Sequence, residues 1–165
     1  MPMLTLLKKV KFDGVGHCLW QLLPVHFHQV FWNCLLLPPM EDVCISYVEG
    51  FPLSTLNDCK SLRRLTLYQC DKLRGSLGDP VSRELSLESL SIQNCGIESL
   101  PSIIAWAPTC NLRSLEVSRI HGGPDEINIQ VPFHKLPTLL AKCSNTLTSL
   151  KLTVDNLCML SHCVI

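Results

Sequence analysis

The sequence predicts an α/β fold: an open solenoid in which about six short parallel strands form one sheet and helical or irregular segments return along its other side. Three observations predict it. One apolar pattern recurs six times, its copies follow one another at the distances of a structural repeat, and the composition favours an aliphatic core, because 47% of the residues are hydrophobic and only 6% are aromatic.

The recurring pattern is apolar-x-x-apolar-x-apolar-x-x-(Cys, Asn or apolar). Its copies lie near residues 7–15, 40–48, 62–70, 87–95, 112–120 and 147–155. The second apolar positions are 10, 43, 65, 90, 115 and 150, so the spacings are 33, 22, 25, 25 and 35 residues. Three of these spacings fall within the roughly 20–29 residues of a short repeat. The two longer ones must hold inserted loops or longer helices.

The centre of each copy predicts a strand, because alternate side chains leave opposite faces of a strand. The two apolar residues would point into the core and the residues between them outward. The outward set is Lys9, Lys11 and Asp13; Asp42, Cys44 and Ser46; Arg64, Thr66 and Tyr68; Ser89, Ser91 and Gln93; Ser114, Glu116 and Ser118; and Ser149, Lys151 and Thr153. Parallel neighbours need crossover segments, for which the spacings leave room.

One further position of each copy alternates in charge. It is occupied by Lys8, Glu41, Arg63, Glu88, Arg113 and Thr148, so the sign alternates through the first five. Neighbouring strands lie about 4.8 Å apart, so these charges could pair across strands. The alternative is that the alternation only avoids stacking like charges.

The segments between the copies predict the return path. Residues 52–59 begin with a Pro suited to a first helical turn, and 134–143 carry apolar residues at amphipathic helical spacing. Residues 102–107 predict a short helix, and 17–37 predict the largest return segment, with its helix beginning after Pro24. Residues 75–80 and 121–126 predict turns.

Charge and hydropathy exclude several classes of protein. Lys plus Arg and Asp plus Glu each number 14, so there is no basic excess of the kind that nucleic-acid-binding domains carry. A chain with 17% charged residues and this hydrophobicity is not disordered. Residues 14–40 contain no Asp, Glu, Lys or Arg and include a segment of about the length of a membrane span, but Pro24 and several polar residues interrupt it, which favours a buried helix. The N-terminus has no signal-peptide pattern.

The ten cysteines predict a reducing compartment rather than a disulfide framework. No Cys-x-x-Cys pair occurs, and several Cys occupy repeated positions of the apolar pattern, where Cys acts as a small buried hydrophobe. At Cys70 and Cys95 the expected role is to satisfy backbone groups where the chain leaves the strand. We expect a cytoplasmic protein, or one shared with the nucleus.

The sequence offers little for catalysis, metals or cofactors. His26 and His28 alternate like two ligands on a strand, but no third ligand lies nearby, which favours structural histidines over zinc. A Gly-x-Ser-x-Gly elbow and the glycine-rich phosphate loops are absent. We therefore expect no catalytic residue, no metal and no cofactor. A small hydrolase with a Cys or Ser nucleophile is the weaker alternative.

The segment from Cys59 to Cys70 resembles the cysteine-containing class of leucine-rich repeat. Residues 110–115 and 143–150 are similar to its first half, and 87–95 to its second half. This class is similar to the repeat array of F-box proteins, the substrate receptors of cullin-type ubiquitin ligases. Residues 95–101 are also similar to the repeats of plant nucleotide-binding immune receptors. The resemblance covers roughly residues 3–160 and implies a single leucine-rich-repeat domain over 1–165.

The sequence departs from both families. No F-box-like segment stands before Met3, no phosphate loop is present, and the last residues, NLCMLSHCVI, are apolar rather than a polar cap. We therefore expect an uncapped piece of a longer array, whose ends present apolar faces meant for neighbours.

The resemblance implies a non-catalytic module that recognises a protein partner on the concave face of its sheet, without nucleic acid, small-molecule cofactor or membrane. The alternative is the sensor array of a nucleotide-binding immune receptor. Arg and Tyr are favoured anchors at interfaces. The contacts we expect are Lys11, Arg64, Tyr68, Gln93 and Glu116.

Overall fold

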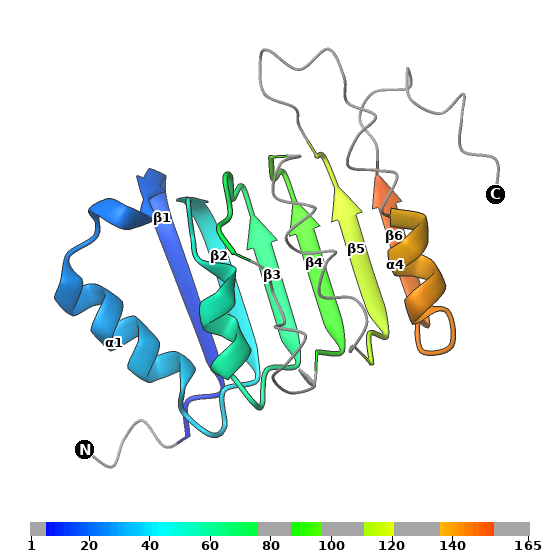
Figure 1. Cartoon of the computed structure of the whole chain (residues 1–165), viewed down its shortest axis with the longest axis horizontal. Coiled ribbons are helices and arrows are strands. Elements are labelled where there is room, and N and C mark those ends of the chain that lie inside the picture. Colours follow the sequence, from blue (N-terminus) through cyan, green and yellow to red (C-terminus); the bar gives the residue numbers. More distant parts are fainter. Residues whose placement is uncertain (1–5, 76–86, 97–110, 121–135, 154–165) are drawn as a thin grey trace.

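The computed structural model describes residues 6–75, 87–96, 111–120 and 136–153 (Figure 1). Its six strands form one parallel sheet in the order β1-β2-β3-β4-β5-β6. The strands are β1 (Lys9–Leu19), β2 (Asp42–Glu49), β3 (Arg64–Tyr68), β4 (Ser89–Gln93), β5 (Ser114–Ser118) and β6 (Ser149–Thr153). The expected α/β fold with six parallel strands is thus confirmed.

The apolar positions of the pattern lie side by side across the sheet. Val43 is opposite Leu65, Leu65 opposite Leu90, Leu90 opposite Leu115, and Leu115 opposite Leu150. The first four of these side chains are at most 1% exposed, whereas Leu150 on β6 is 46% exposed. The first five copies of the pattern therefore add their apolar pairs to one core, and among the described residues that core opens at β6.

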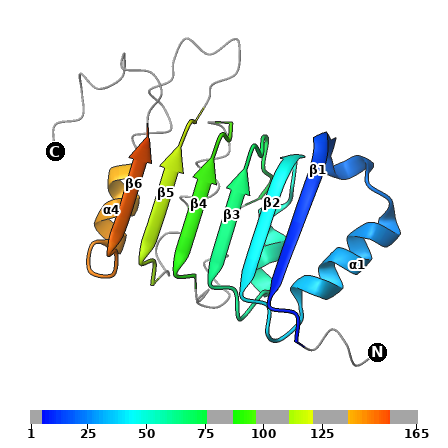
Figure 2. The ribbon, with the colours of Figure 1, turned by 180° about the vertical axis from the view of Figure 1, so that it is seen from behind.

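The described helical segments lie over one face of the sheet or beyond its β1 edge, and none of them lies on the other face (Figures 1 and 2). They are η1 (Trp20–Leu22), α1 (Val25–Leu35), η2 (Leu53–Asp58) and α4 (Leu136–Cys143). The helix after Pro24 and the helical segments within 52–59 and 134–143 lie where the sequence predicts them. The helix expected at 102–107 and the turn at 121–126 lie outside the described residues, as do residues 76–80 of the first predicted turn.

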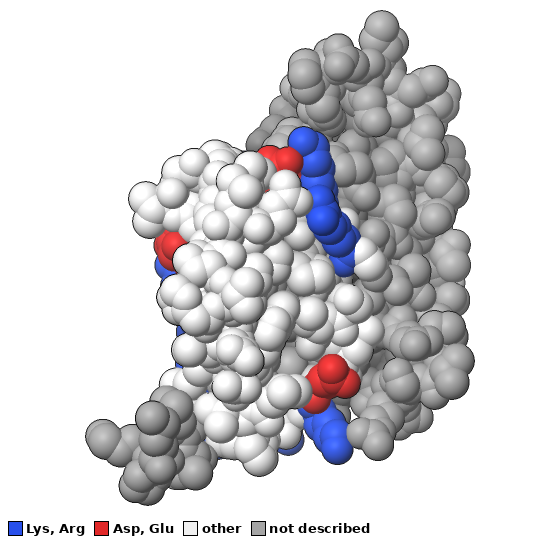
Figure 3. Space-filling model, turned by 60° about the vertical axis from the view of Figure 1, so that its left-hand side comes forward, with Lys and Arg blue, Asp and Glu red and all other residues white. Residues whose placement is uncertain are grey.

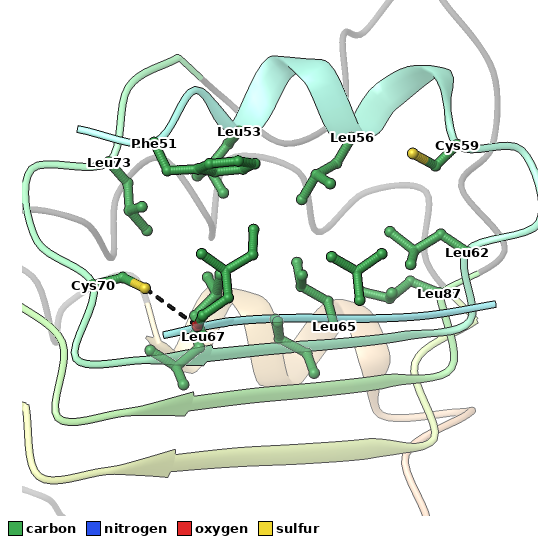
Figure 4. Close-up of a cluster of buried hydrophobic side chains, with 14 of the residues drawn as sticks. Phe51, Leu53, Leu56, Cys59, Leu62, Leu65, Leu67, Cys70, Leu73 and Leu87 are labelled. Atoms are coloured by element: carbon green, nitrogen blue, oxygen red, sulfur yellow. Dashed lines mark hydrogen bonds between the residues drawn. The ribbon is translucent and has the colours of Figure 1, made fainter. Parts of the chain in front are cut away.

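The core lies between η2 and the sheet (Figure 4). Leu53 and Leu56 point down from η2 onto Leu65 and Leu67 of β3, and all four are at most 1% exposed. At the β1 end, aromatic rings replace leucines. There Trp20 contacts four phenylalanine rings, with centroids 4.8–6.2 Å away: Phe12, Phe27, Phe31 and Phe51. An aliphatic centre and an aromatic end together form one continuous interior.

Cys70 and Cys95 serve the backbone where the strands end. The Cys70 thiol donates to the carbonyl oxygens of Ile45 (3.4 Å) and Tyr68 (3.5 Å), and the Cys95 thiol to those of Leu67 (3.6 Å) and Gln93 (3.4 Å). Figure 4 draws the first of these bonds. Both cysteines are fully buried. The structure therefore agrees with the backbone-satisfying role expected at this position.

In β1, one expected position of the pattern is wrong. The pattern placed Val15 at the end of the first copy, but Val15 is 91% exposed, and Cys18 pairs with Val48 at that place. Between Asp13 and Cys18 the register shifts, so residues 14–17 form a bulge. Gly14 allows it, because a Cβ there would lie 2.5 Å from the Tyr47 carbonyl oxygen. Sequence spacing cannot reveal such an insertion when apolar residues occur on both sides of it.

A left-handed residue follows each of the first five strand cores. His17, Tyr47, Gln69, Asn94 and Arg119 have φ of 63°, 58°, 49°, 52° and 53°. Left-handed backbone costs a non-glycine residue about 1–2 kcal/mol. In three cases the same amide donates to a carbonyl of the next strand: Gln69 to Gln93 (2.9 Å), Asn94 to Ser118 (3.0 Å) and Arg119 to Thr153 (3.2 Å). These bonds extend the ladder past the strand ends and offset part of that cost.

The uncharged stretch expected to form a buried helix contains the end of β1, then η1 and α1. Phe31 and Leu35 of α1 are buried against the core. Among the described residues, the model contains no helix with the length and apolar character that crossing a bilayer requires. All seven described cysteines are free thiols, and Cys110, Cys158 and Cys163 lie outside the described residues.

Candidate functional site: the open face of the sheet

The bare side of the sheet, here called the open face, is formed by the outward residues of the six strands (Figure 2). Most of them are exposed or half-buried, as expected, but Ser46 and Ser118 are only 3% and 8% exposed. Both are short side chains between taller neighbours: Ser46 lies between Asp13 and Tyr68 in the register. The Ser46 hydroxyl also donates to the Phe12 carbonyl oxygen at 3.3 Å. These two serines are therefore not available as contacts.

The strands place all five expected contact residues on this face. Lys11 lies on β1, Arg64 and Tyr68 on β3, Gln93 on β4 and Glu116 on β5. Tyr68 and Gln93 are direct neighbours in the register. Lys11 pairs with Cys44, so β2 separates it from Arg64 and Tyr68. Tyr68 and Gln93 therefore lie side by side, and Gln93 is in turn hydrogen-bonded to Glu116. Lys11 lies apart from these three residues.

Glu116 is the centre of a hydrogen-bonded group on β4 to β6. Its carboxylate accepts from the Lys151 ammonium at 2.6 Å, from the Ser91 hydroxyl at 2.9 Å and from the Gln93 amide at 3.0 Å. The bond from Lys151 is the main reason that the pKa of Glu116 lies below its ordinary value. Since Glu116 and Gln93 are held by these bonds, they form a pre-arranged polar platform rather than free anchors.

Asp42 organises the opposite part of the open face. One of its carboxylate oxygens lies 3.3 Å from the Lys9 ammonium and 3.3 Å from Arg64 Nε. Lys11 lies 3.2 Å from Asp13 on its own strand. Exposed pairs of this kind each contribute only about 0–1 kcal/mol. A partner could therefore exchange them for its own contacts at small cost.

The alternating charges at the start of the strands pair in two places. Lys8 contacts Glu41 at 3.3 Å, and Arg63 contacts Glu88 at 3.3 Å. The alternation thus brings opposite charges together as well as avoiding like ones. In the fifth and sixth copies the series ends with Arg113 and Thr148, and Thr148 donates its hydroxyl to the Arg113 carbonyl oxygen at 3.1 Å.

Tyr47 is a site residue that the sequence pattern missed. Its ring lies 5.4 Å from that of Tyr68, edge to face, and 5.9 Å from that of His17. The hydrogen bond with Tyr68 raises the pKa of the Tyr47 hydroxyl. Tyr47 takes the left-handed position after Ser46 and so falls outside the alternation on which the prediction relied. The only sequence signal was its place between Ile45 and Val48, which the pattern treats as variable.

Three of the described cysteines have a raised thiol pKa, whereas the hydrogen bond with Cys70 lowers the pKa of the Cys95 thiol, which is fully buried. Burial raises the pKa of the Cys44 thiol and raises that of Cys59 to about 12. The hydrogen bond with Cys95, followed by burial, raises the pKa of Cys70. A thiol with a raised pKa holds little of the reactive thiolate. None of these three thiols has the environment of a catalytic cysteine.

His26 and His28 lie on helix α1 and not on a strand, so they do not alternate as two ligands would. The His28 ring stacks on Trp20 with centroids 4.8 Å apart, and its Nε2 lies 3.0 Å from the Trp20 carbonyl oxygen. Because a carbonyl only accepts, Nε2 is the donor. In the described part of the chain, no three His, Cys, Asp or Glu side chains form a group that could hold a metal ion.

The α1 end of the molecule is a second conspicuous surface. Figure 3 shows a broad uncharged area there, because α1 and η1 contain no charged residue. Leu22, Val25 and Val30 are 61–78% exposed within it. None of the described residues covers these three side chains, and that the chain is an uncapped piece of a longer array stays a prediction.

Comparison with protein-family models, curated proteins and solved structures finds no match for this chain.

Proposed function

We propose that the chain is a non-catalytic protein-recognition module of the leucine-rich-repeat type, which binds a partner protein on the open face. The support for the repeat assignment is the register: equivalent residues of successive copies are direct neighbours from β2 to β6. A rigid array of this kind presents a preformed surface, so binding does not require the surface to order. The F-box receptor array remains the favoured model, with the immune-receptor sensor as its alternative.

The observation that carries the proposal is the aromatic pair Tyr47 and Tyr68 at the carboxyl ends of β2 and β3 on the bare sheet face, with the polar platform of Gln93 and Glu116 beside it. Tyrosine supplies large contact area at low entropy cost, and a ring surrounded by polar groups is a common interface anchor. Arg64 adds a guanidinium on the strand of Tyr68, and its Nε lies 3.3 Å from the Asp42 carboxylate.

The test is affinity capture with the full chain and two variants, each compared with the wild type. The first variant, Tyr47→Ala with Tyr68→Ala, removes the aromatic pair. The second, Lys60→Ala, changes an exposed residue outside the strands and serves as the control. Proteins that wild type and control enrich equally, and that the double variant loses, support the proposal.

Affinity for a captured protein should then fall at least tenfold in the double variant, because losing a central aromatic anchor typically costs about 2 kcal/mol or more. If the double variant retains its fold by circular dichroism and captures the same proteins with the same affinity, the open face is not the binding surface.

A further inference from the structure

A polar hollow lies at the start of strands β3 to β6, away from the aromatic pair. It measures about 600 Å³ and is open to solvent. Its walls carry two guanidinium groups, one carboxylate, two amides and two hydroxyls: Arg63, Glu88, Arg113, Asn111, Asn145, Thr146 and Thr148. The formal charge of this lining is therefore +1, in a chain whose net charge is zero.

Within this lining, some groups are already used. Glu88 is paired with Arg63 at 3.3 Å. Thr146 donates its hydroxyl to the Leu112 carbonyl oxygen at 2.9 Å, and Thr148 donates to that of Arg113. These contacts hold the Arg63, Glu88, Thr146 and Thr148 side chains in place, and the hydroxyl hydrogens of both threonines are already used in hydrogen bonds.

Three side chains of the lining with N–H donors have no partner among the described residues. In the described part of the chain, the side chains of Arg113, Asn111 and Asn145 make no hydrogen bond or ion pair. The reason for Arg113 lies in the sequence: the alternating row supplies Glu88 to Arg63, but puts Thr148 where the next acid would follow. The hollow is thus lined by unused donors around an unpaired cation.

We propose that this hollow receives a carboxylate side chain, Asp or Glu, of the protein partner, with Arg113 as its ion-pair partner and the amides of Asn111 and Asn145 as additional donors. A guanidinium matches a carboxylate in shape and charge, and charge-assisted bonds are stronger than neutral ones. The inference rests on the proposed function only in taking the ligand to be part of a protein. It adds one acidic residue to the description of that partner.

The test is an NMR titration of the ¹⁵N-labelled full chain with a blocked Ala-Ala-Glu-Ala-Ala peptide, compared with the same peptide carrying Gln instead of Glu. The Glu peptide should shift the Arg113 Nε–Hε signal and the Asn111 and Asn145 side-chain amide signals at millimolar concentration, and the Gln peptide should not. Arg113→Gln should weaken Glu-peptide binding about two- to fivefold, the range for an exposed ion pair. Lys60→Gln, which removes a charge outside the lining, should leave it unchanged.

Equal shifts by both peptides, no shift by either, or unchanged binding to Arg113→Gln would each overturn the assignment. Inorganic phosphate is the third ligand: if it binds at lower concentration than the Glu peptide, the hollow is a phosphate site and the proposal is wrong. The Tyr47→Ala, Tyr68→Ala double variant should bind the Glu peptide normally. Loss of capture with normal peptide binding, or the reverse, then tells which of the two proposals fails.

Discussion

Truncation of Leu65 measures how much one position of the repeated pattern contributes to stability. Leu65 is 1% exposed and lies between Val43 and Leu90 in the register. Leu65→Ala removes three carbons, which at about 0.8 kcal/mol each amounts to about 2.4 kcal/mol of lost transfer free energy. The cavity left between two neighbouring strands raises the expected loss to about 3–4 kcal/mol.

The matched control is Leu150→Ala, the same substitution at the equivalent position of β6. Leu150 is 46% exposed, so its truncation should cost only about 1 kcal/mol. The assay is urea unfolding of the full-length variants followed by circular dichroism, with the free energies of unfolding compared at equal slope. If Leu65→Ala costs no more than Leu150→Ala, the two positions do not differ in burial and the stacked core is refuted.

Three further outcomes follow from individual contacts. Gly14→Ala should destabilise the chain by at least about 2 kcal/mol, because the added Cβ would lie 2.5 Å from the Tyr47 carbonyl oxygen. Gly16→Ala is the control: the space around Gly16 is open, so the variant should lose only about 1 kcal/mol, owing to the φ of +78°. Equal urea midpoints for the two variants would contradict this prediction. Folding lowers the pKa of Glu116, so its carboxylate stabilises the fold above the unfolded pKa near 4.5 and loses this contribution as the pH falls through the folded pKa. In Glu116→Gln, the free energy of unfolding should therefore fall less steeply between neutral and acidic pH than in the wild type. An unchanged pH dependence would argue against the contact with Lys151. A thiol reagent, read out by mass spectrometry, should label Cys44 of the folded chain far faster than the buried Cys59, Cys70 and Cys95. Unfolding in guanidinium should remove this difference in rate. Rapid labelling of Cys70 in the folded chain would show that the core is open to solvent.

Much of the fold could be predicted because the apolar pattern is strict. Val43, Leu65, Leu90 and Leu115 stand at the same position of successive copies, and the structure places them side by side. The same strictness predicted the backbone role of Cys70 and Cys95. Both thiols stand three residues after the second inward-facing residue of their copies, Leu67 and Ile92, which is where the chain leaves the strand.

The errors arose where the chain leaves this regularity. The bulge after Asp13 adds residues that keep an apolar Val15 in apparent register, so only the three-dimensional pairing reveals Cys18 as its replacement. Tyr47 joined the site because its backbone is left-handed, a property that neither composition nor spacing indicates.

Side-chain partnerships were the least predictable part of the site. The pattern placed Glu116 and Gln93 on the open face, but it could not tell that they bond to each other. It also could not show that Arg113, one of five charged residues in the alternating row, would be left without an acid among the described residues. Such choices depend on rotamers and on distances between strands, which a linear pattern does not contain.

The central claim is that a partner protein binds the bare face of the sheet. The most direct measurement is cross-saturation NMR of the labelled full chain bound to a captured partner, which attenuates the signals of residues in contact with it. The account predicts attenuation at Tyr47, Tyr68 and Gln93, with the signals of η2 unaffected. Attenuation confined to η2 and α1, with full intensity on the open face, would contradict it.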